Sequence, residues 1–417
     1  MTSPPTVPDA LAPDVAARSR RGGFRDVFRV GEFRALFAAH CISMPGSIVA
    51  GLAVSVLLYR RTGSAFLAAS VLALEFLPYL AGVALSALAD RLPPRAGMVG
   101  ASLISAGFAG VMAIPRLPIP LLLLMIVGIG TVAPFFLGIR SAVLAEVLPG
   151  PPYMIGASLM GMIAQLSQVG GYALGGLLLV VITPSQALLI DSGTFVLAAL
   201  LLQFGCRKRP PRTSARKGGT FRDSLAVVPV LRKRRNLRTV VLMTTLVPML
   251  AVIPESVANP YVAQHGGSSG RGALGVGIYL AAIPIGSVLG DLAATQFLTH
   301  DQRLRLVRLS AVLCFVPGLF FAFSPRLPIA LILLALTGVA GIWGMGLSQL
   351  RVELSPPEMV GRVITLTTSL QMVTQGIGFA VGGAIADGLP AADVIVIGAA
   401  LGLLTSLVLG RKPLQGH

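Results

Sequence analysis

Residues 117–138 read LPIPLLLLMIVGIGTVAPFFLG and contain no charged side chain. Such a run can cross a membrane, because the hydrocarbon core is about 30 Å thick and a helix rises about 1.5 Å per residue. Similar apolar runs follow one another along the chain, which is 54% hydrophobic and 12% charged, with a mean hydropathy of +0.83. This composition leaves too little polar surface for a water-soluble domain. We therefore predict an all-α integral membrane protein.

The apolar runs fall into two groups of six on either side of a basic segment. About twelve transmembrane helices in two six-helix bundles are the predicted architecture. The predicted domains are a disordered and interfacial cytoplasmic tail (1–33), an N-terminal bundle (34–206), a basic cytoplasmic linker (207–238), a C-terminal bundle (239–410) and a cytoplasmic tail (411–417). The predicted spans are 35–58, 66–89, 96–114, 117–138, 154–182, 185–205, 239–263, 273–298, 304–323, 328–349, 363–386 and 391–410.

Positive charge lies in alternate loops. With both termini in the cytoplasm, the inside segments hold 28 of the 33 Lys and Arg residues. Because cytoplasmic loops of inner-membrane proteins carry excess Lys and Arg, this distribution predicts cytoplasmic N- and C-termini in the inner (cytoplasmic) membrane. The linker motifs RKRPPR (207–212) and RKRR (232–235) favour contact with anionic lipid headgroups. The net charge of +17 therefore indicates orientation and lipid contact, not nucleic-acid binding.

The two halves of the chain share a repeated pattern. Glu146-Val-Leu-Pro149 followed by Gly175-Gly176 matches Glu353-Leu-Ser-Pro356 followed by Gly382-Gly383 at an offset of 207 residues. An earlier pair, SALAD (86–90) and SVLGD (287–291), repeats at an offset of 201. Two homologous six-helix halves explain both matches. Facing bundles create a cavity near the bilayer midplane that rocking exposes to each side in turn, so the repeat favours transport by alternating access.

Residues 30–410 resemble the major facilitator superfamily, and in particular its branch of drug, macrolide and siderophore exporters. ADRLPPR (89–95) is similar to the family signature Gly-x-x-x-Asp-Arg-x-Gly-x-Arg-Arg in the loop between helices 2 and 3. YRRTGS (59–64) and RSAVLAE (140–146) are similar to the exporter branch. The resemblance implies a latch at the cytoplasmic gate, in which the aspartate meets the start of helix 11. The residues expected in this inner gate are Asp90, Arg91, Arg95 and Arg362.

Glycines recur at helical spacing in helices 5 and 11. GGYALGG (170–176) resembles the antiporter motif Gly-x-x-x-Gly-Pro-x-x-Gly-Gly, with Tyr172 in place of the proline. Small residues four positions apart let helix backbones approach closely, so these glycines are expected to form the sliding surface between the bundles; ordinary helix packing explains them equally well. The packing glycines are Gly171, Gly175, Gly176, Gly378, Gly382 and Gly383.

Acidic residues inside the spans are candidates for proton coupling, because an unpaired charge at the bilayer centre costs at least about 2.5 to 3.5 kcal/mol. Glu75 lies 15 residues before Asp90, about 22 Å along helix 2. It is the first candidate for a proton carrier or a site for a cationic substrate. Asp191, Glu255 and His40 are further candidates, although each also fits a structural role. Gln165, Gln168, Gln371 and Gln375 are expected either to line the cavity with amides or to bond neighbouring helices.

We predict a secondary transporter that moves a small, largely hydrophobic molecule, with proton-coupled efflux favoured over import of a metabolite. The apolar spans offer no cluster of Lys or Arg for a phosphorylated or dicarboxylate substrate. An integral-membrane enzyme is a weaker alternative, because no catalytic cluster is evident. No phosphate-binding GxxxxGK[ST] motif, metal site or cofactor is predicted. The expected partners are the substrate, protons and membrane lipids, and the protein is expected to act as a monomer.

Overall fold

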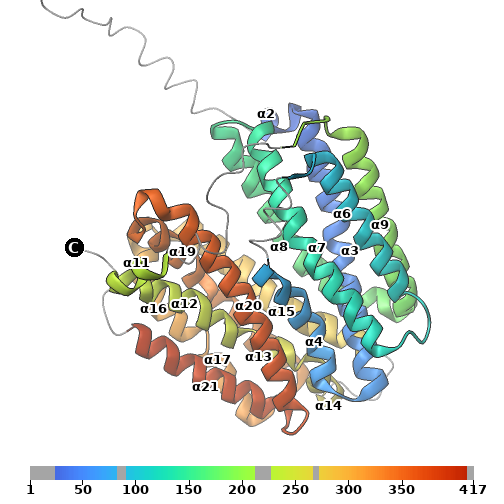
Figure 1. The fold of residues 1–417 in the computed structure, drawn as a ribbon. Helices are drawn as coiled ribbons and strands as arrows, with labels where there is room; N and C mark the ends of the chain where they lie inside the picture. Colours follow the sequence, from blue (N-terminus) through green and yellow to red (C-terminus); the bar gives the residue numbers. More distant parts are fainter. Residues whose placement is uncertain (1–23, 82–90, 212–226, 266–271, 411–417) are drawn as a thin grey trace, which may run out of the picture.

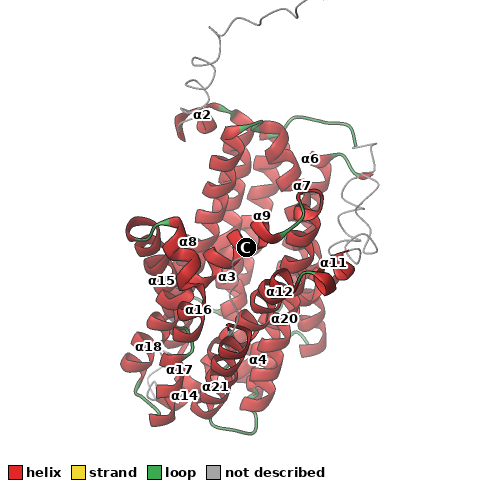
Figure 2. Cartoon of the chain, turned by 90° about the vertical axis from the view of Figure 1, so that its left-hand side faces the viewer, coloured by secondary structure: helices red, strands yellow, loops and turns green. Residues whose placement is uncertain are grey.

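The computed structural model describes residues 24–81, 91–211, 227–265 and 272–410. Within these ranges the chain forms helices and connecting loops without a β-strand (Figure 2). Ten helical segments of these ranges are long and apolar enough to cross a membrane. The shorter α4 and the helix α20 occupy the positions of two further predicted spans. The predicted all-α membrane fold is confirmed.

The first half contains a short surface helix and six helical spans. Its elements are α2 (Phe24–Arg29), α3 (Gly31–Thr62), α4 (Ala65–Phe76) continued by the 3-10 turn η2 (Leu77–Ala81), α6 (Pro94–Met112), α7 (Ile119–Val147), α8 (Pro151–Val181) and α9 (Pro184–Gly205). The end of this half that bears α2 and the residues after α9 is called the basic end below; the loop after α3 lies at the opposite end (Figure 1).

The second half repeats this order with more interruptions. Its elements are α11 (Val227–Lys233), α12 (Arg235–Ala251), α13 (Ile253–Ser256), α14 (Ala258–His265), α15 (Gly272–Phe297), α16 (His300–Leu313), α17 (Val316–Leu319), η3 (Phe320–Phe323), α18 (Leu327–Val339), η4 (Ala340–Ile342), α19 (Trp343–Leu354), η5 (Pro357–Met359), α20 (Val360–Ala386) and α21 (Ala391–Gly410).

The seventh span is broken where the sequence analysis predicted a continuous helix. It consists of α12, α13 and α14, which meet at Val252 and Val257. Pro248 lies inside α12 and Pro254 lies in the first turn of α13. Proline lacks a backbone N–H and clashes with the preceding turn, so two prolines six residues apart interrupt the helical hydrogen bonds. Transporters often place their sites at such breaks.

The fourth span is longer than predicted. We expected it to end at Gly138, but α7 continues to Val147. The chain between these positions contains no proline and no glycine, so nothing stops the helix before Pro149. Arg140 therefore lies within a membrane helix, which corrects the prediction that the fourth span ends at Gly138 without a charged side chain.

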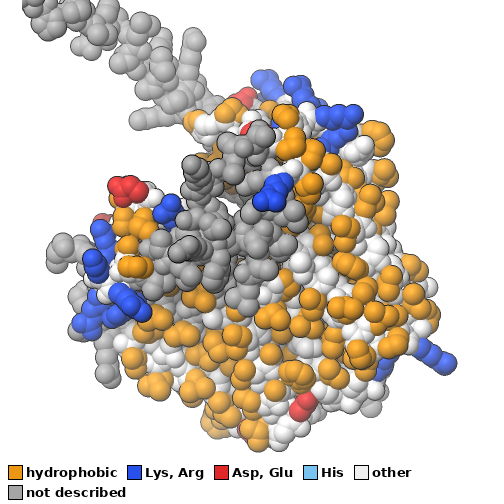
Figure 3. All heavy atoms as spheres, in the orientation of Figure 1, with side chains coloured by type: hydrophobic (Ala, Val, Ile, Leu, Met, Phe, Trp, Pro, Cys, Tyr) orange, Lys and Arg blue, Asp and Glu red, His pale blue; other side chains and the backbone are white. Residues whose placement is uncertain are grey.

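The two halves meet along two pairs of helices. Helix α8 packs against α15, and α20 packs against α4, so in each pair one helix comes from each half (Figure 1). An apolar cluster joins the halves and includes Leu52 and Val56 of α3, Tyr172 of α8 and Tyr261 and Tyr279 of the second half. Apolar side chains also cover much of the outer surface in Figure 3, while Lys and Arg gather mainly near α2 and α11.

The packing glycines divide into two kinds. A Cβ on Gly171 would lie 2.8 Å from Ile48 of α3, and a Cβ on Gly175 would lie 3.0 Å from Val49. Gly378 corresponds to Gly171 in the repeat, and a Cβ on Gly378 would meet the backbone of Met249 in α12. These glycines therefore pack helices 5 and 11 onto the first helix of their own half.

The last glycine of each motif faces the other half instead. A Cβ on Gly176 would lie 3.0 Å from the Ala273 carbonyl and from the Gly277 Cα in α15. A Cβ on Gly383 would lie 3.0 Å from the Phe66 Cα in α4. The offset of 207 residues that relates Gly176 to Gly383 thus relates equivalent contacts across the interface. This equivalence supports the internal repeat.

Candidate functional site

Glu75 is enclosed by three helices of the first half. Its Oε1 would lie 3.4 Å from a Cβ on Gly51 of α3, so the carboxyl group faces that helix. On the other side, a Cβ on Gly130 of α7 would lie 3.0 Å from the Glu75 carbonyl. The side chain is half-buried and has no described hydrogen bond or ion pair. Glu75 therefore faces α3 and α7 of its own half, and its role as a proton carrier remains a prediction.

Asp191 of α9 is almost fully buried, with 2% of its surface exposed, and it packs against α3. The Thr194 hydroxyl lies 3.3 Å from Asp191 Oδ1 and donates to the Asp191 carbonyl at 2.7 Å. A Cβ on Gly46 of α3 would lie only 2.7 Å from Oδ1. Asp191 also interacts electrostatically with Glu75. Two of the predicted acids thus lie against the same stretch of α3.

Glu255 lies at the break in the seventh span and faces the first half. It lines a cavity of about 10 Å³ together with Gly51, Ser55, Tyr172 and Asn259. This volume is close to what one water molecule needs, so a substrate enters only if the helices move. Polar contact across the halves occurs beside it: Asn259 Nδ2 donates to Ser55 Oγ at 2.9 Å. Ser55 in turn donates to the Ala68 carbonyl at 3.0 Å.

His40 is paired with a residue that the sequence analysis did not consider. Arg140 Nη1 of α7 lies 2.8 Å from His40 Nδ1 of α3. His40 is 8% exposed, and its Nε2 is buried without a hydrogen-bond partner. Tyr79 of η2 interacts electrostatically with Arg140. The continuous helical pattern up to Pro149 was the signal that could have placed Arg140 inside the span.

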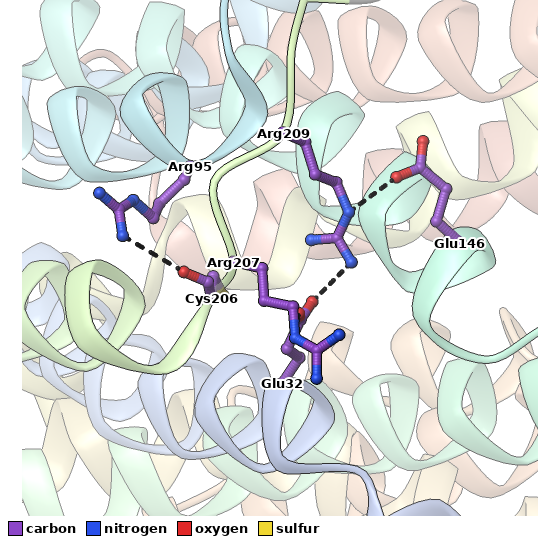
Figure 4. Close-up of polar contacts among 6 residues, drawn as sticks. All are labelled: Glu32, Arg95, Glu146, Cys206, Arg207 and Arg209. Atoms are coloured by element: carbon purple, nitrogen blue, oxygen red, sulfur yellow. Dashed lines mark hydrogen bonds and ion pairs between the residues drawn. The ribbon is translucent and has the colours of Figure 1, made fainter.

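No described contact joins the predicted inner-gate residues to one another. Asp90 lies outside the described residues. Arg95 Nη1 donates to the carbonyls of Gln203 at 3.1 Å and Cys206 at 3.5 Å, so it caps the C-terminal end of α9 (Figure 4). Arg91 and Arg362 are exposed, and no described contact joins either of them to Arg95. A latch between this loop and helix 11 therefore remains a prediction.

The beginning of the linker is held to the first half by ion pairs at the basic end. Glu32 of α3 lies 3.3 Å from Arg207 Nε and 2.7 Å from Arg209 Nη2. Arg209 Nε also lies 3.2 Å from Glu146 Oε2 at the end of α7 (Figure 4). These groups border a surface cavity of about 650 Å³. The sequence analysis predicted lipid contact for this segment and did not predict the ion pairs.

The four glutamines do not form one cluster in this conformation. Gln165 and Gln168 are exposed on α8, and Gln371 and Gln375 are half-buried on α20. No described hydrogen bond links one pair to the other. A shared cavity wall therefore remains a prediction for these amides.

An acidic contact missed from the sequence closes the opposite end. Asp387, at the end of α20, accepts hydrogen bonds from the Ser64 hydroxyl at 2.8 Å and from the backbone N–H of Ala65 at 2.6 Å. The N–H of Phe66 lies at 3.3 Å. The carboxylate thus caps the N-terminus of α4 across the interface between the halves, where a negative charge is favoured. The sequence signal that could have indicated this contact is an aspartate at a helix C-terminus, where a negative charge is otherwise unfavourable.

Two repeated helical halves with a polar site between them are the arrangement of a secondary transporter. The chain belongs to the Major Facilitator Superfamily, whose family model matches residues 36–379. It functions as a transporter and not as an enzyme.

Similar proteins include exporters. The chain is 25% identical over 374 residues to macrolide efflux protein A of Streptococcus pyogenes, covering 85% of this chain and 89% of that protein. It is 30% identical over 395 residues to the enterobactin exporter EntS of Salmonella typhimurium, covering 91% and 92%. Among solved structures, the nucleoside transporter NupG has a TM-score of 0.68 at 14% identity, covering 91% of this chain and 98% of that chain. The last similarity concerns the fold alone.

Proposed function

We propose that this protein exports a small, largely hydrophobic molecule across the cytoplasmic membrane by proton-coupled antiport. The observation that carries the proposal is the group of three membrane-embedded carboxyl residues, Glu75, Asp191 and Glu255, which have no described basic partner. Carboxyl groups inside a membrane protein that lack a counter-charge commonly mark proton or cation pathways.

The positions of the acids support coupling to the movement of the halves. Glu75 belongs to α4, which packs against α20 of the other half. Glu255 belongs to the broken seventh span and lines the small cavity at the interface. A rocking motion changes the water access of both side chains, and an ionised carboxylate is far cheaper in water than in an apolar interior. Proton uptake and release can therefore accompany opening and closing.

The similarity to macrolide and enterobactin exporters supports efflux over uptake. Import of a metabolite is the alternative, because the fold is shared with transporters that carry other substrates. Cytoplasmic termini, location in the inner membrane, contact of the linker with lipids and action as a monomer belong to the same proposal. The excess of Lys and Arg in alternate loops supports the orientation.

The test is transport into proteoliposomes of hydrophobic antibiotics and dyes under proton gradients of both polarities. Antiport predicts accumulation when the lumen is more acidic than the medium, and proton symport predicts accumulation with the opposite gradient. Glu75→Gln is expected to abolish the gradient-driven part. Glu358→Gln, at an exposed glutamate of η5, is the matched control and should retain it.

The other outcomes contradict parts of the proposal. Movement without dependence on the gradient would indicate facilitated diffusion. Accumulation driven only by an acidic medium would favour the importer. If no compound of the panel moves, the hydrophobic substrate class is wrong and import of a polar metabolite becomes the better hypothesis.

A further inference from the structure

Arg140 is a cation within a membrane helix that has no described acidic partner. It lies seven residues before the end of α7, about 10 Å from that end. The ion pairs among the described residues involve Asp26, Glu32 and Glu146, and none of them includes Arg140. A charged side chain at such a depth is expensive unless another group or a ligand compensates it.

The pairing with His40 leaves donors unused. Arginine can only donate, so the contact of 2.8 Å requires His40 Nδ1 to accept and places the imidazole proton on Nε2. That Nε2 is buried without a described hydrogen-bond partner, and the Met160 backbone lies near the ring. Arg140 has five N–H donors, and this contact occupies one of them.

The phenol of Tyr79 adds a third polar group from a third helix. It lies close enough to both Glu75 and Arg140 for an electrostatic interaction and is half-buried. Helices 1, 2 and 4 thus bring together a guanidinium, an imidazole N–H and a phenol. The groups that Arg140 and His40 leave unused are all donors, and none of the three side chains carries a negative charge at neutral pH. The cluster is complementary to an acceptor with negative charge.

Arg140 and His40 are separated from Glu75 along the membrane normal, whereas Tyr79 lies only four residues after Glu75 in the sequence. On α3, His40 precedes Gly51, which faces Glu75, by eleven residues or about 16 Å. On α7, Arg140 follows Gly130, which also meets Glu75, by ten residues or about 15 Å. Both helices therefore place the donors at a level nearer the basic end than the acids.

We propose that Arg140, His40 and Tyr79 bind the anionic group, a carboxylate or an ionised phenol, of an amphiphilic substrate. The inference deepens the proposed function and rests on it. A carboxylate can accept two parallel hydrogen bonds from a guanidinium, which gives orientation as well as affinity. The apolar part of the substrate then lies toward the interior of the interface. The carboxyl groups, which lie farther from the basic end, stay free to carry protons.

Equilibrium binding of two dyes with the same ring system tests the charge selectivity. Fluorescein is an anion at neutral pH and rhodamine 6G is a cation, and both are measured by fluorescence polarisation with the purified full-length protein in a neutral detergent. Wild type is expected to bind fluorescein more tightly than rhodamine 6G. Arg140→Gln should weaken fluorescein binding by about 10- to 100-fold, the usual range for a hydrogen bond to a charged group. Rhodamine 6G binding should not weaken.

Two further variants control for charge and folding. Arg140→Lys keeps the charge without the paired geometry and should restore part of the affinity. Arg308→Gln removes a half-buried arginine of α16 in the other half and should leave fluorescein binding unchanged. Retained rhodamine 6G binding and an unchanged melting temperature show that Arg140→Gln is folded.

The inference is overturned if wild type binds no fluorescein up to the solubility limit, if rhodamine 6G binds as tightly, or if Arg308→Gln causes the same loss. Displacement of fluorescein by an equal concentration of phosphatidylglycerol would assign the donors to a lipid headgroup and also overturn it. The proposed function fails separately: gradient-driven movement of rhodamine 6G without fluorescein binding keeps the exporter and rejects the anion site. Fluorescein binding without gradient-driven transport would keep the anion site and reject the proton-coupled exporter.

Discussion

Removing the carboxylate of Asp387 should loosen the contact between α20 and α4. Asp387→Ala deletes the acceptor for the Ser64 hydroxyl and for the backbone N–H groups of Ala65 and Phe66. Ser64 still caps α4, because its hydroxyl accepts from the Leu67 N–H at 3.2 Å. The helix therefore stays capped, and the lost free energy is that of the contact between the halves.

The magnitude follows from the geometry of the cap. Replacing a capping side chain by alanine costs about 0.5–2 kcal/mol, which corresponds to about a 2- to 30-fold change in an equilibrium. Asp387 is exposed, so solvent screening favours the lower part of this range. The equilibrium that changes is the separation of the halves at this end, because the contact joins residues more than 300 positions apart.

The assay is the rate of maleimide labelling at Ala68→Cys in a background in which Cys41, Cys206 and Cys314 are replaced by alanine. Ala68 is 1% exposed and lines the interface cavity, so its labelling requires the halves to part. Asp387→Ala should raise the labelling rate by about 2- to 30-fold, in the lower part of this range. Asp393→Ala removes an exposed acid from the first turn of α21 at the same end and should leave the rate unchanged. Equal rates in the two variants would refute the reasoning.

Two further predictions concern packing and the linker. Gly277→Ala should lower the melting temperature by several degrees, because the added Cβ meets the backbone of α8. The control Gly161→Ala faces open space and should leave the melting temperature unchanged or raise it. Equal melting temperatures of the two variants would contradict the packing argument. Glu32→Gln should speed tryptic cleavage after Arg207 and Lys208 by releasing the linker, and the exposed Glu358→Gln should not. Identical digestion patterns would show that the ion pairs of Glu32 do not hold the segment.

The spans could be predicted from hydropathy because that pattern is local. The repeat could be predicted because its motifs recur at a nearly constant offset. Each apolar run is long enough to be recognised without knowledge of its neighbours. The end of the fourth span was misplaced because apolarity declines at Gly138 while the helix continues to Val147. The two prolines of the seventh span were visible, but whether they kink or break a helix depends on how neighbouring helices satisfy the freed backbone groups.

The contacts of the candidate site could not be predicted from spacing. We predicted the depth of Glu75 from its separation from Asp90 in the sequence, but its position against Gly51 depends on how α3 and α4 pack. The interaction of Arg140 with His40 joins residues 100 positions apart. The glycine motif predicted close approach without identifying the partner helix. Such pairs are set by tertiary packing, which a single sequence does not encode in a readable pattern.

The contact made by Asp387 has no counterpart among the described residues of the first half. Subtracting the repeat offset of 207 leads to Val180 near the end of α8, and no described hydrogen bond joins α8 to α15. Closely packed glycines lie along both interfaces, and the hydrogen bonds of Asp387 are described along one of them. Higher ionic strength should weaken the contact of Asp387 between α20 and α4 more than the packing of α8 against α15. Two interfaces related by the internal repeat should therefore respond differently to salt.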